Sequence, residues 1–147
     1  MSLKLRLQEE MKTAMRAKDK DRLSTIRLML ADLKRVEVDE RIELSDERIL
    51  AILDKMQKQR RDSISQFEQA AREDLAAKER AELEVIAEFL PEPLGEAELN
   101  ALIDAAVAEA GATTMADMGK VMALVKPKAQ GRADMSEISK AVKNRLS

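Results

Sequence analysis

The residues best suited to chemistry are the basic side chains of residues 112–147. This stretch holds seven bases against three acids, whereas residues 91–111 hold five acids and no base. The bases surround a turn that contains Gly131 and continue along the last predicted helix: Lys120, Lys126, Lys128, Arg132, Lys140, Lys143 and Arg145. Because lysine and arginine attract phosphate and glycine allows close backbone approach, this pattern favours a phosphate-binding surface.

A solvated face is the plainer interpretation of the same charges, and the sequence alone favours it. Cations near helix C-termini complement the helix dipole without any ligand. Gly119 points slightly toward binding, because a glycine inside a helix costs about 1 kcal/mol relative to alanine and usually has a reason. For Gly119 alone, we expect that reason to be tight helix packing.

A second basic stretch lies between Asp54 and Asp62 in a long predicted helix. We interpret it mainly as solvated surface, with partner binding as the alternative. Its members are Lys55, Lys58, Arg60 and Arg61.

The composition excludes most enzyme chemistry. The 147 residues contain no Cys and no His, which removes thiol nucleophiles, imidazole bases and the common zinc and copper sites. With two Phe, no Trp and no Tyr, stacking of unpaired bases on aromatic rings is also disfavoured. The sequence has neither a Ser-x-x-Lys box nor a phosphate-cradling loop. We therefore assign no catalytic residue, no metal and no cofactor.

Helices must position these side chains, because apolar residues recur at helical spacing along the whole chain. We predict an all-α fold of two small helical-bundle subdomains, an N-terminal one over residues 1–90 and a C-terminal one over 91–147. The boundary is placed at Pro91-Glu92-Pro93, because proline lacks the amide donor that a helix needs.

Local signals set the expected helix ends. Side-chain caps are expected at Ser2, Asp19 or Asp21, Ser45, Thr114 with Asp117, and Asp134. Gly111 and Pro127 are expected to end helices. The first helix is expected to bury Leu3, Leu7, Met11 and Met15, and Met115 is expected on the buried stripe of a later one. Residues 37–44 show no clear period, and the polar residues 57–63 lead us to expect a helix middle that projects beyond the core.

The N-terminus suggests a location. It carries alternating charges in place of an apolar signal core, and the absence of cysteine fits a reducing compartment. We therefore expect a cytoplasmic protein. No run approaches the roughly 20 apolar residues of a membrane-spanning helix.

Several motifs together resemble the YqeY-like family over nearly the whole chain. They are Gln59-Arg60-Arg61-Asp62-Ser63-Ile64, Arg72-Glu73-Asp74-Leu75 with Glu79 and Glu82, Phe89-Leu90-Pro91, Asp117-Met118-Gly119-Lys120-Val121-Met122, and Gly131-Arg132-Ala133-Asp134. Three positions depart from the family pattern: Ala71 stands in place of Gly, Phe89 in place of Tyr, and Gly95 in place of a Ser or Thr cap.

The resemblance implies a function linked to tRNA. The C-terminal part of the family is similar to the tail domain of the GatB component of the glutamine-dependent aspartyl/glutamyl-tRNA amidotransferase, a carbon-nitrogen ligase, in which the tail helps to hold the tRNA. It implies that Gly119-Lys120 and Gly131-Arg132 contact RNA. The chain lacks the other domains that amidotransferase activity requires, so we expect an accessory protein that binds tRNA or structured RNA. The alternative is an adaptor whose N-terminal helices dock on a tRNA-modifying or synthetase partner.

Overall fold

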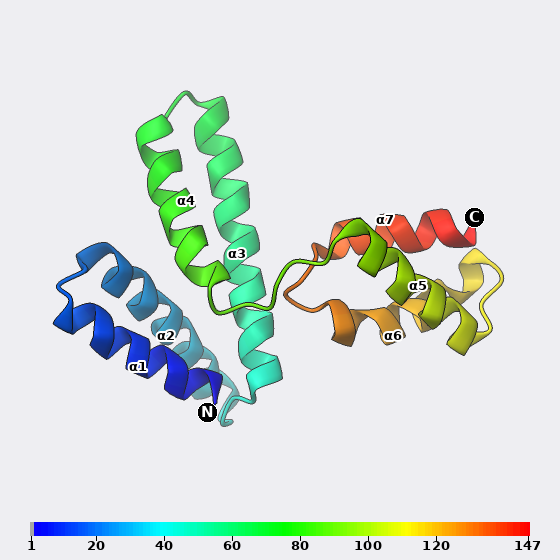
Figure 1. Cartoon of the computed structure of the whole chain (residues 1–147), viewed down its shortest axis with the longest axis horizontal. Helices are drawn as coiled ribbons and strands as arrows, with labels where there is room; N and C mark the ends of the chain where they lie inside the picture. The colour runs from blue at the N-terminus through cyan, green and yellow to red at the C-terminus, as the bar shows by residue number, and fades with distance from the viewer. Residues whose placement is uncertain (1) are drawn as a thin grey trace. The chain divides into compact units, whose positions relative to one another are not determined.

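The computed structural model describes residues 2–147, which form seven α-helices and one 3₁₀ turn (Figure 1). The helices are α1 (Leu3–Arg16), α2 (Lys20–Glu40), α3 (Asp46–Gln69), α4 (Glu73–Ala87), α5 (Glu96–Ala110), α6 (Met118–Ala129) and α7 (Met135–Leu146), and the 3₁₀ turn is Met115–Asp117. No strand is present within the described residues. The predicted all-α class is therefore confirmed.

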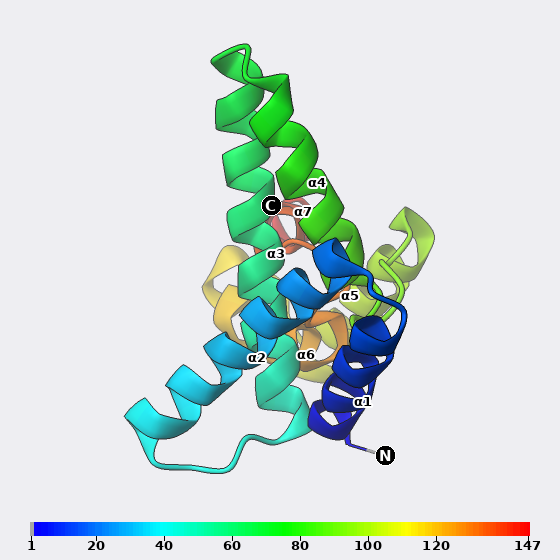
Figure 2. The same cartoon turned by 90° about the vertical axis from the view of Figure 1, so that its left-hand side faces the viewer.

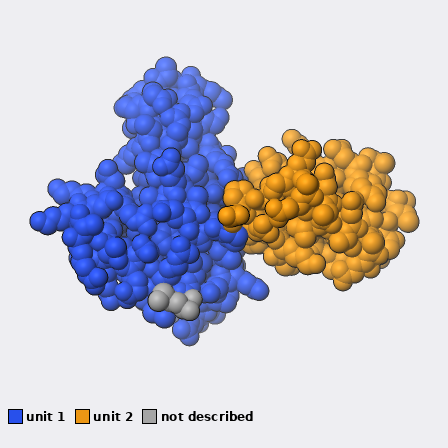
Figure 3. Space-filling view, in the orientation of Figure 1, with its two compact units in different colours: residues 1–91 blue, residues 92–147 orange. Residues whose placement is uncertain are grey.

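The chain divides into two compact units, residues 1–91 and 92–147, which Figure 3 shows in different colours. Each unit has its own core of aliphatic side chains. Fully buried residues of the first include Leu7, Ile26, Ile49, Leu53 and Ile86. Those of the second include Val121, Val125, Ile138 and Val142.

In the first unit, α1 pairs with α2, and α3 pairs with α4 along its length (Figures 1 and 2). Both views show the far end of the α3–α4 hairpin extending past α1 and α2. The middle of α3 is nevertheless packed: Gln57 is buried, and the half-buried Arg60 donates to Glu82 of α4 at 3.3 Å. The polar middle thus projects as part of a hairpin and uses its polar side chains for contacts with α4.

Residues 37–44, for which the sequence shows no clear period, divide at Arg41: α2 continues to Glu40, and Arg41 then adopts a left-handed conformation. Two expectations about buried methionines are wrong. Met15 is 49% exposed, because α1 buries Leu7 and Ala14 and turns the Met15 position outward. Met115 is also exposed, because it lies in the 3₁₀ turn before α6.

Pro127 does not end a helix, contrary to expectation. It lies inside α6, which continues to Ala129. Proline removes the amide donor to the carbonyl four residues earlier and crowds that turn. Here that residue is Ala123, which is small and exposed, and only two residues of α6 follow. The lost hydrogen bond and the crowding therefore affect only the last turn of α6.

The expected caps are present where local sequence specified them. Ser2, Asp19, Ser45 and Asp134 accept backbone amides at the starts of α1, α2, α3 and α7. Thr114 and Asp117 form a capping box. Gly111 closes α5 at φ 63°, whereas Gly95 starts α5 without a side-chain cap.

Residues 2–91 contain no glycine, so their turns use other residues at positive φ. Lys18, Arg41 and Ala71 have φ of 57°, 56° and 57°. Ala71 closes α3 in a Schellman motif, with the Arg72 amide donating to the Phe67 carbonyl at 2.8 Å. A left-handed conformation costs an L-residue roughly 1–2 kcal/mol, so this turn is strained at the position where the family resemblance leads us to expect glycine.

Replacing Ala71 with glycine should stabilise the first unit by about 0.5–1 kcal/mol, because relief of the strain exceeds the added entropy of the unfolded chain. Urea unfolding followed by circular dichroism measures the change. Ala70→Gly is the matched control. It should destabilise the first unit, because Ala70 has an unstrained φ of −85° and glycine there only adds entropy to the unfolded chain. Equal effects of the two substitutions would contradict the assignment of strain to Ala71.

Candidate nucleic-acid interface

Five of the predicted contact residues are exposed lysines: Lys120 in the first turn of α6, Lys126 and Lys128 in its last turn, and Lys140 and Lys143 on α7. No salt bridge joins Lys126, Lys128, Lys140 or Lys143 to another described residue. Their ammonium groups are therefore available to an external anion.

Helix geometry decides which lysines can act together. At about 100° per residue, Lys140 and Lys143 lie about 60° apart and share one face of α7. Lys126 and Lys128 lie about 160° apart and point to different sides of α6. The α7 pair is the part of the candidate surface with the clearest common direction.

Arg132 has partners inside its own unit. Its Nε donates to the Glu92 carbonyl at 2.9 Å, and its Nη2 donates to Glu98 Oε2 at 3.2 Å. Its own carbonyl accepts from the Leu94 amide at 2.7 Å. Arg132 thus ties the segment before α5 to the turn between α6 and α7.

Arg145 and Lys120 are also close to acids. Arg145 Nε donates to Asp104 Oδ1 at 2.9 Å and joins α7 to α5. Lys120 is exposed in the first turn of α6, near Asp117. The Thr113 and Thr114 amides donate to the Asp117 carboxylate and, with a smaller effect of Lys120, hold its pKa below the usual range. The negative charge of Asp117 persists beside Lys120 and offsets it.

The two glycines differ. A Cβ added at Gly119 would meet nothing within 4 Å, so the expectation of tight helix packing is wrong. Gly119 is exposed in the first turn of α6, where another molecule could approach its backbone. Gly131 is buried at φ 73°, a conformation that favours glycine, and this explains it without a ligand.

The sequence profile of the YqeY-like proteins matches residues 4–146. The chain belongs to this family. The family motifs can therefore be assigned to the contacts above: Arg60 pairs with Glu82, Asp117 caps the 3₁₀ turn before α6, and Arg132 ties the turn before α7. Much of the motif set serves the fold.

Similar proteins carry a name that specifies no ligand. "Altered inheritance of mitochondria protein 41, mitochondrial" of Pyrenophora tritici-repentis is 35% identical over 143 residues, which cover 93% of this chain and 77% of that protein. The proteins of that name from Vanderwaltozyma polyspora and Kluyveromyces lactis are 42% and 38% identical, over 58% and 56% of this chain. The matched part spans 47% and 45% of those two proteins, about half their length.

The names of these relatives overturn one expectation. All three are named as mitochondrial proteins, so the cytoplasmic location inferred from the N-terminus is wrong. The alternating charges at the N-terminus and the absence of cysteine were insufficient evidence for the location. Among residues 2–147, no helix has the length and apolar character needed to cross a membrane. The same residues contain no group of three or more acidic side chains arranged to hold a metal ion.

Sequence reasoning missed the acidic partners of the arginines. Glu98 and Asp104 were counted only as the charge of an acidic segment, although their carboxylates pair with Arg132 and Arg145. The signal that could have found them is the excess of acids in residues 91–111 beside an excess of bases in residues 112–147. Opposite charges on neighbouring helices of one small bundle predict pairing between them.

Arg132→Ala should loosen the attachment of the segment before α5. We expect a loss of about 1 kcal/mol, because charge-assisted hydrogen bonds disappear from a half-exposed site. Hydrogen exchange of the Leu94 amide, which donates to Arg132, should become faster. Lys126→Ala removes the same charge from an exposed site and is the control, with little expected change. Unchanged Leu94 exchange in Arg132→Ala would contradict this role.

Proposed function

We propose that the C-terminal unit binds tRNA or similarly structured RNA through the phosphate backbone, using the exposed lysines of its last two helices, Lys126, Lys128, Lys140 and Lys143, as its main contacts. The observation that carries the proposal is that these exposed lysines have no acidic partner among the described residues, whereas Arg132 and Arg145 do. When ammonium groups neutralise RNA phosphates, the counterions condensed on the RNA are released, and this release drives binding. The resemblance to the amidotransferase tail supports tRNA as the RNA.

The available side chains limit how RNA can be recognised. The two Phe of the chain lie at positions 67 and 89, so residues 92–147 contain no aromatic ring. Bases cannot stack on this unit as they do on RNA-binding sheets. Recognition through phosphates and helix shape gives weak sequence preference and strong salt dependence. The protein acts in this proposal as an accessory that holds RNA without reacting with it.

Reversing the charge of Lys126, Lys140 and Lys143 to Glu should weaken tRNA binding at least tenfold at low salt. The slope of log affinity against log salt should become shallower by about 0.7–0.9 for each phosphate that is no longer neutralised. Electrophoretic shift or fluorescence anisotropy across a salt series measures both quantities. Arg132 is left unchanged in this variant, because its removal would also disturb the fold.

The control for this experiment reverses Lys55, Lys58 and Arg61, which are exposed on α3 and make the same change in net charge. It should bind tRNA as the unmodified protein does. The proposal is wrong if the control loses binding equally, or if the unmodified protein fails to bind tRNA at low salt. Weaker binding confined to the control would move the RNA site to the second basic stretch.

Gly119→Ala separates a helix role from an RNA-contact role. Alanine should stabilise α6 by about 0.5–1 kcal/mol, because its Cβ meets no neighbouring atom. If the RNA backbone approaches Gly119, tRNA binding should nevertheless weaken about threefold or more. Ala123→Gly, on an exposed position of the same helix, is the control: it should destabilise α6 and leave binding unchanged. Unchanged binding in Gly119→Ala would remove Gly119 from the interface.

A further inference from the structure

A groove of about 890 Å³ lies between the start of α2 and one face of α4, within the first unit. On the α4 side it is lined by Ala77, Ala81 and Val85, which follow one another at intervals of four residues and so share a helix face. Ser24 and Thr25 line the α2 side. Ala77 and Ala81 are exposed, so a stripe of small side chains is open to another molecule.

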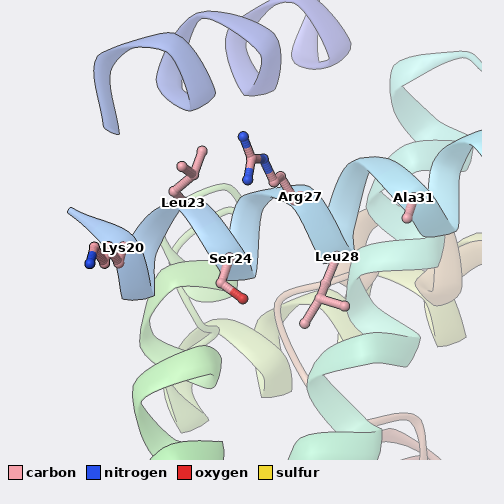
Figure 4. A pocket seen from close by; sticks show the side chains of 6 residues that line it. All are labelled: Lys20, Leu23, Ser24, Arg27, Leu28 and Ala31. Atoms are coloured by element: carbon pink, nitrogen blue, oxygen red, sulfur yellow. The ribbon is translucent and has the colours of Figure 1, made fainter. Parts of the chain in front are cut away.

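The apolar surface continues along α2. Ser24 also lines a second hollow, together with Leu28 one turn further along (Figure 4). In Figure 4 the Ser24 and Leu28 side chains point to the same side of α2, while Leu23 and Arg27 point to the other. Leu28 is 43% exposed and lies next to this hollow. Leu28 therefore offers an apolar contact beside the groove.

The rim of the groove is acidic. It carries five acids, Asp19, Asp21, Glu82, Glu84 and Glu88, against the two bases Arg22 and Lys78. Arg22 is already paired with Glu10 and Glu88, and Glu82 is paired with Arg60. Asp21 and Glu84 are exposed and lie in no salt bridge among the described residues. The rim thus keeps a negative charge that this unit does not neutralise.

We propose that this groove is a docking site for a basic amphipathic helix of a partner protein. The small side chains of α4 allow a helix to approach closely, and the α4 residues that line the groove run from Ala77 to Val85, about 12 Å or about two helical turns, with Glu88 just beyond the end of the helix. Lysine or arginine beside the apolar stripe of the partner would meet Asp21 and Glu84. The same negative rim repels RNA phosphates and anionic lipids, so it selects a cationic polypeptide.

This site is separate from the proposed RNA surface, which lies in the other unit. An adaptor that binds RNA with one unit and a protein with the other requires two such surfaces of opposite charge. The docking proposal does not depend on RNA binding, because its residues, its charge and its test belong to residues 19–88 alone.

The probe is a 15-residue amphipathic helical peptide of Ala, Leu and Lys. Its affinity for the full chain is measured by fluorescence anisotropy. Two comparison peptides are used: one of the same composition with Leu and Lys shuffled around the helix, and one with Glu in place of Lys. We expect binding to the first peptide and at least tenfold weaker binding to the other two. Methyl NMR signals of Ala77 and Ala81 should shift on binding. Equal binding of the shuffled peptide, or shifts confined to other methyl groups, would overturn the proposal.

Charge reversal locates the site. The double variant Asp21→Lys, Glu84→Lys should weaken binding of the Lys-containing peptide at least fivefold. A second variant, Ala81→Lys, fills the groove and should weaken binding by a similar factor. Asp39→Lys with Glu43→Lys changes the net charge equally at exposed positions outside the groove and should leave affinity within twofold. Equal weakening in this control would reduce the binding to non-specific charge and overturn the proposal.

Sedimentation tests the other occupant. If the full chain forms a dimer that Ala81→Lys dissociates, a second copy fills the groove and the assignment to a partner helix is wrong. A monomer at all concentrations, together with peptide binding that Ala81→Lys abolishes, supports the proposal.

Discussion

Ion pairs of arginine connect segments of this protein that also contribute side chains to its two buried cores. Arg22 bonds Glu88 of the segment after α4, Arg60 bonds α4 from α3, and Arg132 joins the segment before α5 to the turn before α7. The planar guanidinium suits these contacts, because it can donate in two directions to fixed oxygens. The cores are built almost entirely of aliphatic and methionine side chains, and these bonds add contacts at turns and helix ends.

Lysine has a different place in the same structure. Among residues 2–147 it contributes to two ion pairs, Lys4 with Glu37 and Lys12 with Glu9. The lysines at the end of α6 and along α7 stay exposed and without acidic partners within the described residues. A flexible, strongly hydrated ammonium loses little when it is left in water, and it remains available to an anion that arrives later. The arginines therefore carry most of the ion pairs, and the lysines most of the charge that stays exposed, a division that the net charge of −2 conceals.

Short-range features were predictable from the sequence, and long-range pairing was not. The caps at Ser2 and Asp134 depend on amides within three residues, so a local reading finds them. The pairing of Arg132 with Glu98 spans 34 residues and depends on how α5, α6 and α7 pack. The prediction that Pro127 ends a helix was wrong because a proline in the final turn costs only one backbone hydrogen bond and one steric contact. A helix tolerates that loss at its end. Gly119 was misjudged because packing around a helix cannot be read from its own sequence.

The candidate RNA surface changed most between sequence and structure. The sequence alone gave no reason to rank the nine candidate positions, seven basic residues and two glycines. The fold gives several of them partners or structural roles within the protein. Arg132 and Arg145 are already bonded, Gly131 satisfies a left-handed turn, and Lys120 lies beside a persistent negative charge. A phosphate must compete with these internal partners at an arginine, whereas Lys140 and Lys143 have no ion-pair partner among the described residues. Affinity for RNA should therefore follow the free lysines more closely than the total number of basic residues.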